Sequence, residues 1–136
     1  MLFKQIFSFM KKIFTLFVLV VNLSFIWAQN ENHNKTVDTF IMNFNNNNYE
    51  EIYQSFSPRM QNARTKQYYF NFFERVKKTS GALLFLELLT YSENSNNKSK
   101  AQYNATHENE NTTIKITVDA AGKIIGLYIL RDKLLM

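Results

Sequence analysis

The sequence predicts one α+β domain in which N-terminal helices pack on one face of a four-stranded antiparallel sheet. Two features of the hydrophobic pattern support this prediction. Apolar residues recur at helical spacing through residues 37–76, and from residue 82 they alternate with polar residues, as in strands that bury one face. Helices that precede strands along the chain favour an α+β domain, with the two kinds of element in separate layers.

The composition limits the class of protein. The chain has 136 residues, 46% of them apolar, which is enough for one small hydrophobic core but not for two domains. The absence of cysteine excludes disulfide scaffolds, thiol catalysis, Cys-based zinc sites and a lipid anchor on an N-terminal cysteine.

Residues 1–28 are typical of a secretory signal peptide. Lysines come first, an apolar run over residues 13–21 follows, and the segment ends at the small residue Ala28. We expect cleavage after Ala28, with Met1 or Met10 as the start of translation, and export of the mature chain to the periplasm or the medium. The alternative is a retained membrane anchor, but the apolar run is shorter than the roughly 20 residues that a transmembrane helix needs.

The charge of the chain is concentrated in this leader. Removal of residues 1–28 removes three lysines and no acidic residue, which lowers the formal net charge from +5 to +2. Lys77-Lys78 is the only adjacent pair of basic residues in the remainder. A dense basic stripe is therefore missing, and we do not expect nucleic-acid binding.

Two helices are expected after a polar linker over residues 29–36. They cover residues 37–44 and 49–56, where apolar residues recur at positions i, i+3, i+4 and i+7. The second helix should end at Ser57-Pro58, because a proline pushes the preceding residue out of the helical conformation.

A third helix is expected between Thr65, which can cap its first turn, and Gly81, which lies just beyond its end. Lysines near its C-terminus suit the helix dipole. We expect Phe72 at the centre of an inner face, which consists of Tyr69, Phe72, Phe73 and Val76.

Four strands with short turn-like connections should follow and form a meander. In the third strand we expect Ile114, Ile116 and Val118 to point to the covered face. The predicted strands are residues 82–91, 100–108, 112–119 and 123–131, which gives a domain over residues 37–131 and a C-terminal tail over residues 132–136.

One stretch runs from Phe40 through Asn48-Tyr49-Glu50-Glu51-Ile52-Tyr53 to Phe56-Ser57-Pro58-Arg59-Met60, and a second is Val118-Asp119-Ala120-Ala121-Gly122-Lys123-Ile124-Ile125-Gly126-Leu127. These two stretches resemble the DUF3887 family. The resemblance implies the NTF2-like, cystatin-like superfamily, in which a curved sheet surrounds a conical pocket. Similar exported domains occur alone or ahead of a serine hydrolase. The Ser-x-x-Lys spacing occurs here at Ser8, in the leader, and at Ser95, in a turn-like segment, and neither position is expected to be a hydrolase nucleophile. The resemblance therefore implies a non-enzymatic accessory or binding domain, which can work with such a hydrolase.

The alternative function is a small enzyme that uses Glu87 and His107 as an acid–base pair. Glu87 interrupts an apolar strand, and His107 lies in the next strand. If the hairpin is centred near Asn97, the two residues face each other, and a carboxylate can orient an imidazole for proton transfer. The other interpretation is that Glu87 belongs to the wetter face of the sheet and that His107 is exposed near a strand end.

Several aromatic and apolar residues are candidates for a pocket or an interface. Even-numbered Leu84, Leu86 and Leu88 are expected to face the helices, and this leaves Phe85 and Leu89 outward. An apolar outer face favours a homodimer, or the binding of a small apolar ligand or an envelope protein. The full set of candidates is Tyr68, Phe70, Phe85, Leu89, Tyr103, Tyr128 and Leu130.

Cofactor and metal sites are not expected. The two histidines, His33 and His107, lack nearby ligand motifs, and the three glycines form no phosphate-binding loop.

Overall fold

The computed structural model describes residues 2–132. For residues 13–30 it describes the backbone only and not the side chains. The chain divides into two compact units, Met1–Asn32 and His33–Met136. The first unit consists of the N-terminal part of α1 (Leu2–Asn45). Within the described residues, none of the helices combines the length and apolar character that a membrane crossing requires.

Two of the predicted segments fall wholly or partly outside the description. The apolar run of the predicted signal peptide and Ala28 lie among the side chains that are not described, and the predicted tail lies outside the described residues except for Asp132. The predicted polar linker is different: α1 continues through residues 29–36, and His33 is buried. From His33 onward this helical segment belongs to the second unit, in which His33 is buried.

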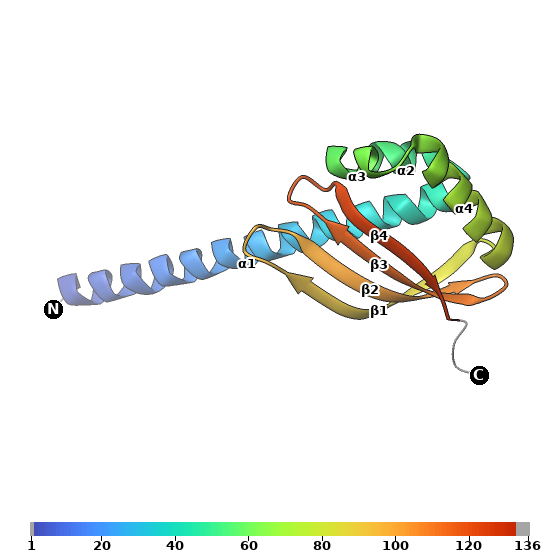
Figure 1. Cartoon of the computed structure of the whole chain (residues 1–136). Coiled ribbons are helices and arrows are strands. Elements are labelled where there is room, and N and C mark those ends of the chain that lie inside the picture. The colour runs from blue at the N-terminus through green and yellow to red at the C-terminus, as the bar shows by residue number, and fades with distance from the viewer. Residues whose placement is uncertain (1, 133–136) are drawn as a thin grey trace. The chain divides into compact units, whose positions relative to one another are not determined.

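The second unit contains the end of α1 and three further helices (Figure 1). α2 (Tyr49–Ser55) ends before Ser57-Pro58 as predicted, but a short helix that the sequence analysis missed, α3 (Pro58–Ala63), begins at the same step. Ser57 caps α3 because its hydroxyl accepts a hydrogen bond from the Met60 N–H, and proline is tolerated in the first turn.

α4 (Lys66–Ser80) has the predicted boundaries. Thr65 caps it through a hydrogen bond from the Tyr68 N–H, and Gly81 ends it. The centre of its inner face is Phe73, which is fully buried, whereas Phe72 is only partly buried. The prediction for Phe72 was therefore displaced by one residue, within a run of adjacent aromatic residues.

The sheet is the predicted antiparallel meander, curved and not closed into a barrel (Figure 1). Its strands lie in the spatial order β1-β2-β3-β4, so β1 and β4 are the edges. The strands are β1 (Leu83–Glu93), β2 (Ser99–His107), β3 (Asn111–Val118) and β4 (Ile124–Arg131).

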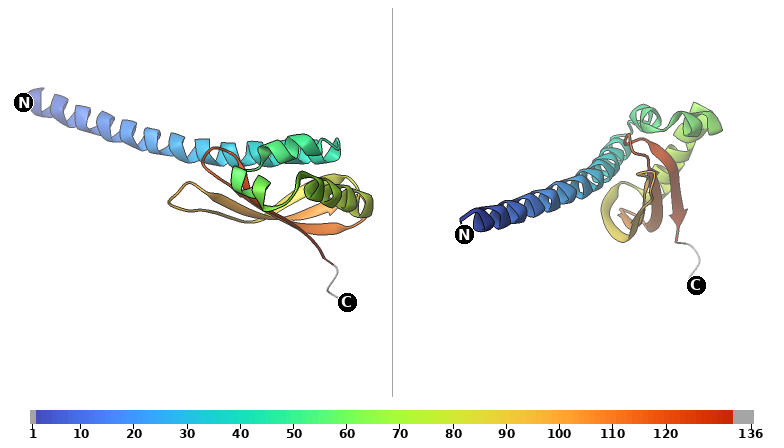
Figure 2. Two further views of the ribbon diagram at one scale, coloured as in Figure 1. Left: turned by 45° about the horizontal axis from the view of Figure 1, so that its top comes forward. Right: turned by 90° about the vertical axis from the view of Figure 1, so that its left-hand side faces the viewer.

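The helices of the second unit lie on one face of this sheet (Figure 2). Rings from three helical segments meet between the layers: Phe44 of α1, Phe56 after α2 and Phe73 of α4 are almost completely buried. They pack on the inner face of β3, where Ile114, Ile116 and Val118 point inward as predicted. The inner side of the curved sheet is thus occupied by the protein's own aromatic core.

The predicted alternation in β1 is only partly right. Leu86 and Leu88 share the inner face with their partners Ala105 and Tyr103, but Leu88 remains half exposed at the sheet edge. Leu84 is exposed, because the pairing of β1 with β2 is irregular between Leu83 and Phe85. A second irregularity follows Leu88, and each one shifts the strand by a residue.

Candidate functional site

The structure does not bring Glu87 and His107 together. Glu87 lies opposite Asn104, and His107 lies opposite Leu83, four positions earlier on β1. Glu87 is exposed on the outer face of the sheet, whereas His107 is buried on the inner face. The assumed hairpin centre was slightly displaced, and because side chains alternate between faces, this displacement separated the two groups.

His107 has internal partners for both ring nitrogens. Nδ1 lies 3.0 Å from the carbonyl oxygen of Gly81, which can only accept, so Nδ1 carries the proton. Nε2 then accepts a hydrogen bond from the Thr112 hydroxyl over 2.9 Å. This histidine joins the end of α4 to β2 and β3, and it is not exposed near a strand end.

A buried polar group around His33 was missed by the sequence analysis. Nδ1 of His33 lies 2.6 Å from Ser99 Oγ, and Nε2 lies 3.2 Å from the Tyr103 hydroxyl. The His33 ring also meets the ring of Tyr91 edge-on at 5.3 Å between centroids. No local sequence signal could have found this group, because the hydrogen-bonded partners are 66 and 70 residues away.

The electrostatics of this group favour a neutral imidazole. Burial lowers the pKa of His33, and the charge of Glu93 opposes this effect. Burial raises the pKa of Tyr103, with Asp38 acting in the same direction. Burial and a hydrogen bond to Glu93 raise the pKa of Tyr91. The candidate Tyr103 is therefore a core residue that holds His33, rather than a residue at a pocket mouth.

The outer face of the sheet carries apolar side chains at both edges. Phe85 of β1, and Tyr128 and Leu130 of β4, point outward and are each about half exposed or more. Leu89 lies at the irregularity that follows Leu88 and is about half exposed as well. Polar residues separate these two apolar edges. The polar residues point outward from β2 and β3 and are Lys100, Gln102, Asn104, Thr106, Thr113, Lys115 and Thr117.

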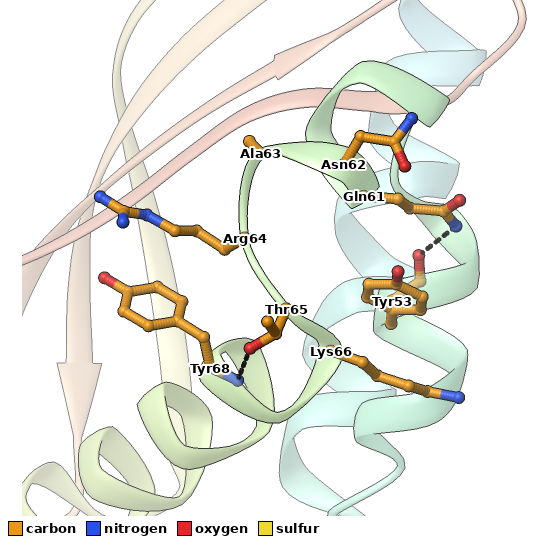
Figure 3. Close-up of a pocket in the computed structure, with 8 residues that line it drawn as sticks. All are labelled: Tyr53, Gln61, Asn62, Ala63, Arg64, Thr65, Lys66 and Tyr68. Atoms are coloured by element: carbon orange, nitrogen blue, oxygen red, sulfur yellow. Dashed lines mark hydrogen bonds between the residues drawn. The ribbon is translucent and has the colours of Figure 1, made fainter.

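Two surface hollows lie beside the helices. The one that we call the α3–α4 hollow has a volume of about 610 Å³. Figure 3 shows its lining, which consists of Tyr53, Gln61, Asn62, Ala63, Arg64, Thr65, Lys66 and Tyr68. The candidate Tyr68 lines this hollow, and the candidate Phe70 lines a second one of about 730 Å³ between α2 and α4. Both candidates are thus surface-accessible, in different hollows.

A metal site is not formed by the residues that the structure describes. No three His, Asp or Glu side chains among them come close enough together to hold a metal ion. The two histidines lie in separate groups, and each is hydrogen-bonded to hydroxyl or carbonyl oxygens.

A comparison with protein-family models found a match. A family model described as "Protein of unknown function (DUF3887)" matches residues 37–127, from the last turns of α1 into β4. No curated protein and no solved structure gave a significant match.

Proposed function

This chain belongs to the DUF3887 family, and we propose that it is an exported, non-enzymatic NTF2-like accessory or binding domain. The exposed apolar side chains at both edges of the sheet's outer face are the observation that supports a binding role. Large apolar side chains on a protein surface mark interaction sites when they gather on one face. The inner side of the sheet offers less room for a ligand or a partner, because Phe44, Phe56 and Phe73 fill it.

The partner that fits this face is a second copy of the chain. A two-fold axis through the outer face would set the β1 edge of one protomer against the β4 edge of its partner, and the reverse. Phe85 and Leu89 would then meet Tyr128 and Leu130 twice in the same interface. Charge also fits, because Glu87 lies at the β1 edge, and Lys115 is paired with Tyr128 near the β4 edge.

Sedimentation equilibrium tests this partner. The chain should form a dimer, and the double variant Phe85→Lys/Leu130→Lys should be a soluble monomer, because a symmetric contact would bury four unpaired charges. The matched control is Met42→Lys, which charges an exposed apolar residue of α1 outside the sheet. If the unmodified protein is monomeric at high micromolar concentration, the second copy is the wrong partner.

Export is tested separately. Expression of the full chain in a Gram-negative host should give a periplasmic protein that begins at Gln29, as measured by intact mass. The variant Ala28→Trp should block this processing, since the cleavage site requires a small residue. Intact protein that begins at Met1 or Met10 and stays in the inner membrane would contradict export of a processed domain.

A further inference from the structure

We propose that the α3–α4 hollow binds a saccharide that carries a carboxylate group. This proposal rests on the proposed function and deepens it, because it assigns a ligand class to an exported binding domain. The volume of about 610 Å³ lies within the range of about 300–1,000 Å³ that is usual for small-molecule sites.

The charge of the hollow favours an anion. Arg64 and Lys66 line it, and no acidic residue does. Lys66 is ion-paired with Glu50, which lies outside the lining. Within the described part of the chain, no carboxylate pairs with the Arg64 guanidinium, which instead lies over the Tyr68 ring at 5.1 Å from its centroid. A guanidinium presents two parallel N–H groups, which match the two oxygens of a carboxylate.

The remaining lining favours a sugar over a simple anion. Tyr53 and Tyr68 come from α2 and α4 and lie on opposite sides of the Arg64-Thr65 connection between α3 and α4 (Figure 3). Tyrosine rings offer flat apolar surfaces to the C–H faces of a sugar ring. The amides of Gln61 and Asn62 supply both donors and acceptors, as neighbouring sugar hydroxyls require.

The local structure holds this lining in place. The Gln61 side chain donates a hydrogen bond to the backbone carbonyl of Tyr53 over 2.9 Å, which joins α3 to α2. The Lys66 ammonium lies over the Tyr53 ring at 5.4 Å from the centroid. Thr65 caps α4 and fixes the start of the helix that carries Tyr68. The two walls are therefore positioned by capping and by side-chain contacts before any ligand binds.

Isothermal titration calorimetry on protein from expression of the full chain tests the proposal. The probes are trigalacturonic acid, the neutral trisaccharide maltotriose and sodium phosphate. Trigalacturonic acid should bind at least about tenfold more tightly than either of the others, since the carboxylate adds charge-assisted hydrogen bonds. Arg64→Gln should weaken its binding by about tenfold or more, and Tyr68→Ala should weaken it as well.

The control is Arg75→Gln, which removes an exposed arginine of α4 outside the hollow. It should leave the affinity unchanged, and thermal melts should confirm that all three variants fold. Equal affinity for the two trisaccharides, an unchanged affinity in Arg64→Gln, or phosphate binding as tight as that of trigalacturonic acid would overturn the proposal. Absence of trigalacturonic acid binding would also overturn it, and the binding role would still stand if the dimer and export experiments succeed.

Discussion

The side-chain amide of Asn45 hydrogen-bonds both backbone groups of Leu83, at the point where the last turn of α1 meets the free edge of the sheet. Nδ2 donates to the Leu83 carbonyl over 2.9 Å, and the Leu83 N–H donates to Oδ1 over 2.8 Å. Asn45 thus takes the place of a neighbouring strand at the first residue of β1. The carbonyl of Asn45 in turn accepts a hydrogen bond from the Lys77 ammonium of α4.

Asn45→Ala should therefore destabilise the fold more than an average surface substitution. The change leaves two backbone groups of a buried residue without their partners, which costs about 1–3 kcal/mol for each buried group. The midpoint of urea unfolding measures the effect. Asn46→Ala is the control, because the neighbouring asparagine is exposed. Equal midpoints for the two variants would show that the Asn45–Leu83 contact contributes nothing.

The core position of Phe73 predicts a contrast with its neighbour. Phe73→Ala should lower the free energy of unfolding by about 3–5 kcal/mol, because its ring is fully buried against Phe40, Phe44 and Phe56. Phe72→Ala should have a clearly smaller effect, since Phe72 is only partly buried. Denaturant titration of both variants measures the difference. A larger effect at Phe72 would mean that α4 presents a different face to the core.

The regular parts of the fold could be predicted from the sequence because their signals are local. The alternation in β3 gave the correct buried face, since this strand keeps a regular register along most of its length. In β1 the same reasoning failed at Leu84, because a break in register moves a residue off its expected face. A run of leucines carries no signal for such a break.

The arrangement of the candidate site depended on contacts that no local pattern encodes. Glu87 and His107 were placed together by an assumed hairpin centre, and a small displacement put them on opposite faces. His33 was assigned to a linker because its surroundings in the sequence are polar. It is helical and buried because Ser99 and Tyr103 satisfy both of its ring nitrogens.

The buried His33 predicts a loss of stability in mild acid. Burial lowers its pKa in the folded protein, so below about pH 6.5, the ordinary value for histidine, the unfolded chain binds more protons than the folded one. The free energy of unfolding should keep its full value above about pH 6.5 and should fall as the pH drops toward the lowered pKa of His33. Urea titrations between pH 7.5 and pH 5.5 measure the change, above the range in which most carboxylates titrate.

The variant His33→Gln isolates the contribution of His33 to the pH dependence of stability, because His107 is present in both the variant and the unmodified protein. The variant should be less stable at pH 7.5, because it loses the contacts of the ring to Ser99, Tyr103 and Tyr91. Its stability should nevertheless fall less between pH 7.5 and pH 5.5 than that of the unmodified protein. Parallel pH profiles for the two proteins would mean that His33 takes up its proton equally well in the folded and unfolded states.

The turn between α4 and β1 predicts that Gly81 tolerates no side chain. Its φ of 83° lies in the region that favours glycine, and an added Cβ would lie 2.8 Å from the Cβ of Glu108. The Gly81 carbonyl also accepts the hydrogen bond from His107, so a displaced turn would disturb the buried imidazole. Gly81→Ala should therefore destabilise the fold by more than about 1 kcal/mol.

Gly126→Ala is the matched control for this prediction, because an added Cβ there meets Thr117 only at ordinary contact distance, 3.5 Å or more. Its effect on the unfolding midpoint should be small, or slightly stabilising, since alanine restricts the unfolded chain. The double variant Gly81→Ala/Glu108→Gly separates the two causes of the Gly81 effect. It removes the clash with the Glu108 side chain and leaves the backbone strain, so it should recover part of the lost stability. Full recovery would mean that the positive φ contributes nothing, and a Gly81→Ala protein as stable as the unmodified one would show that the turn adapts to a side chain.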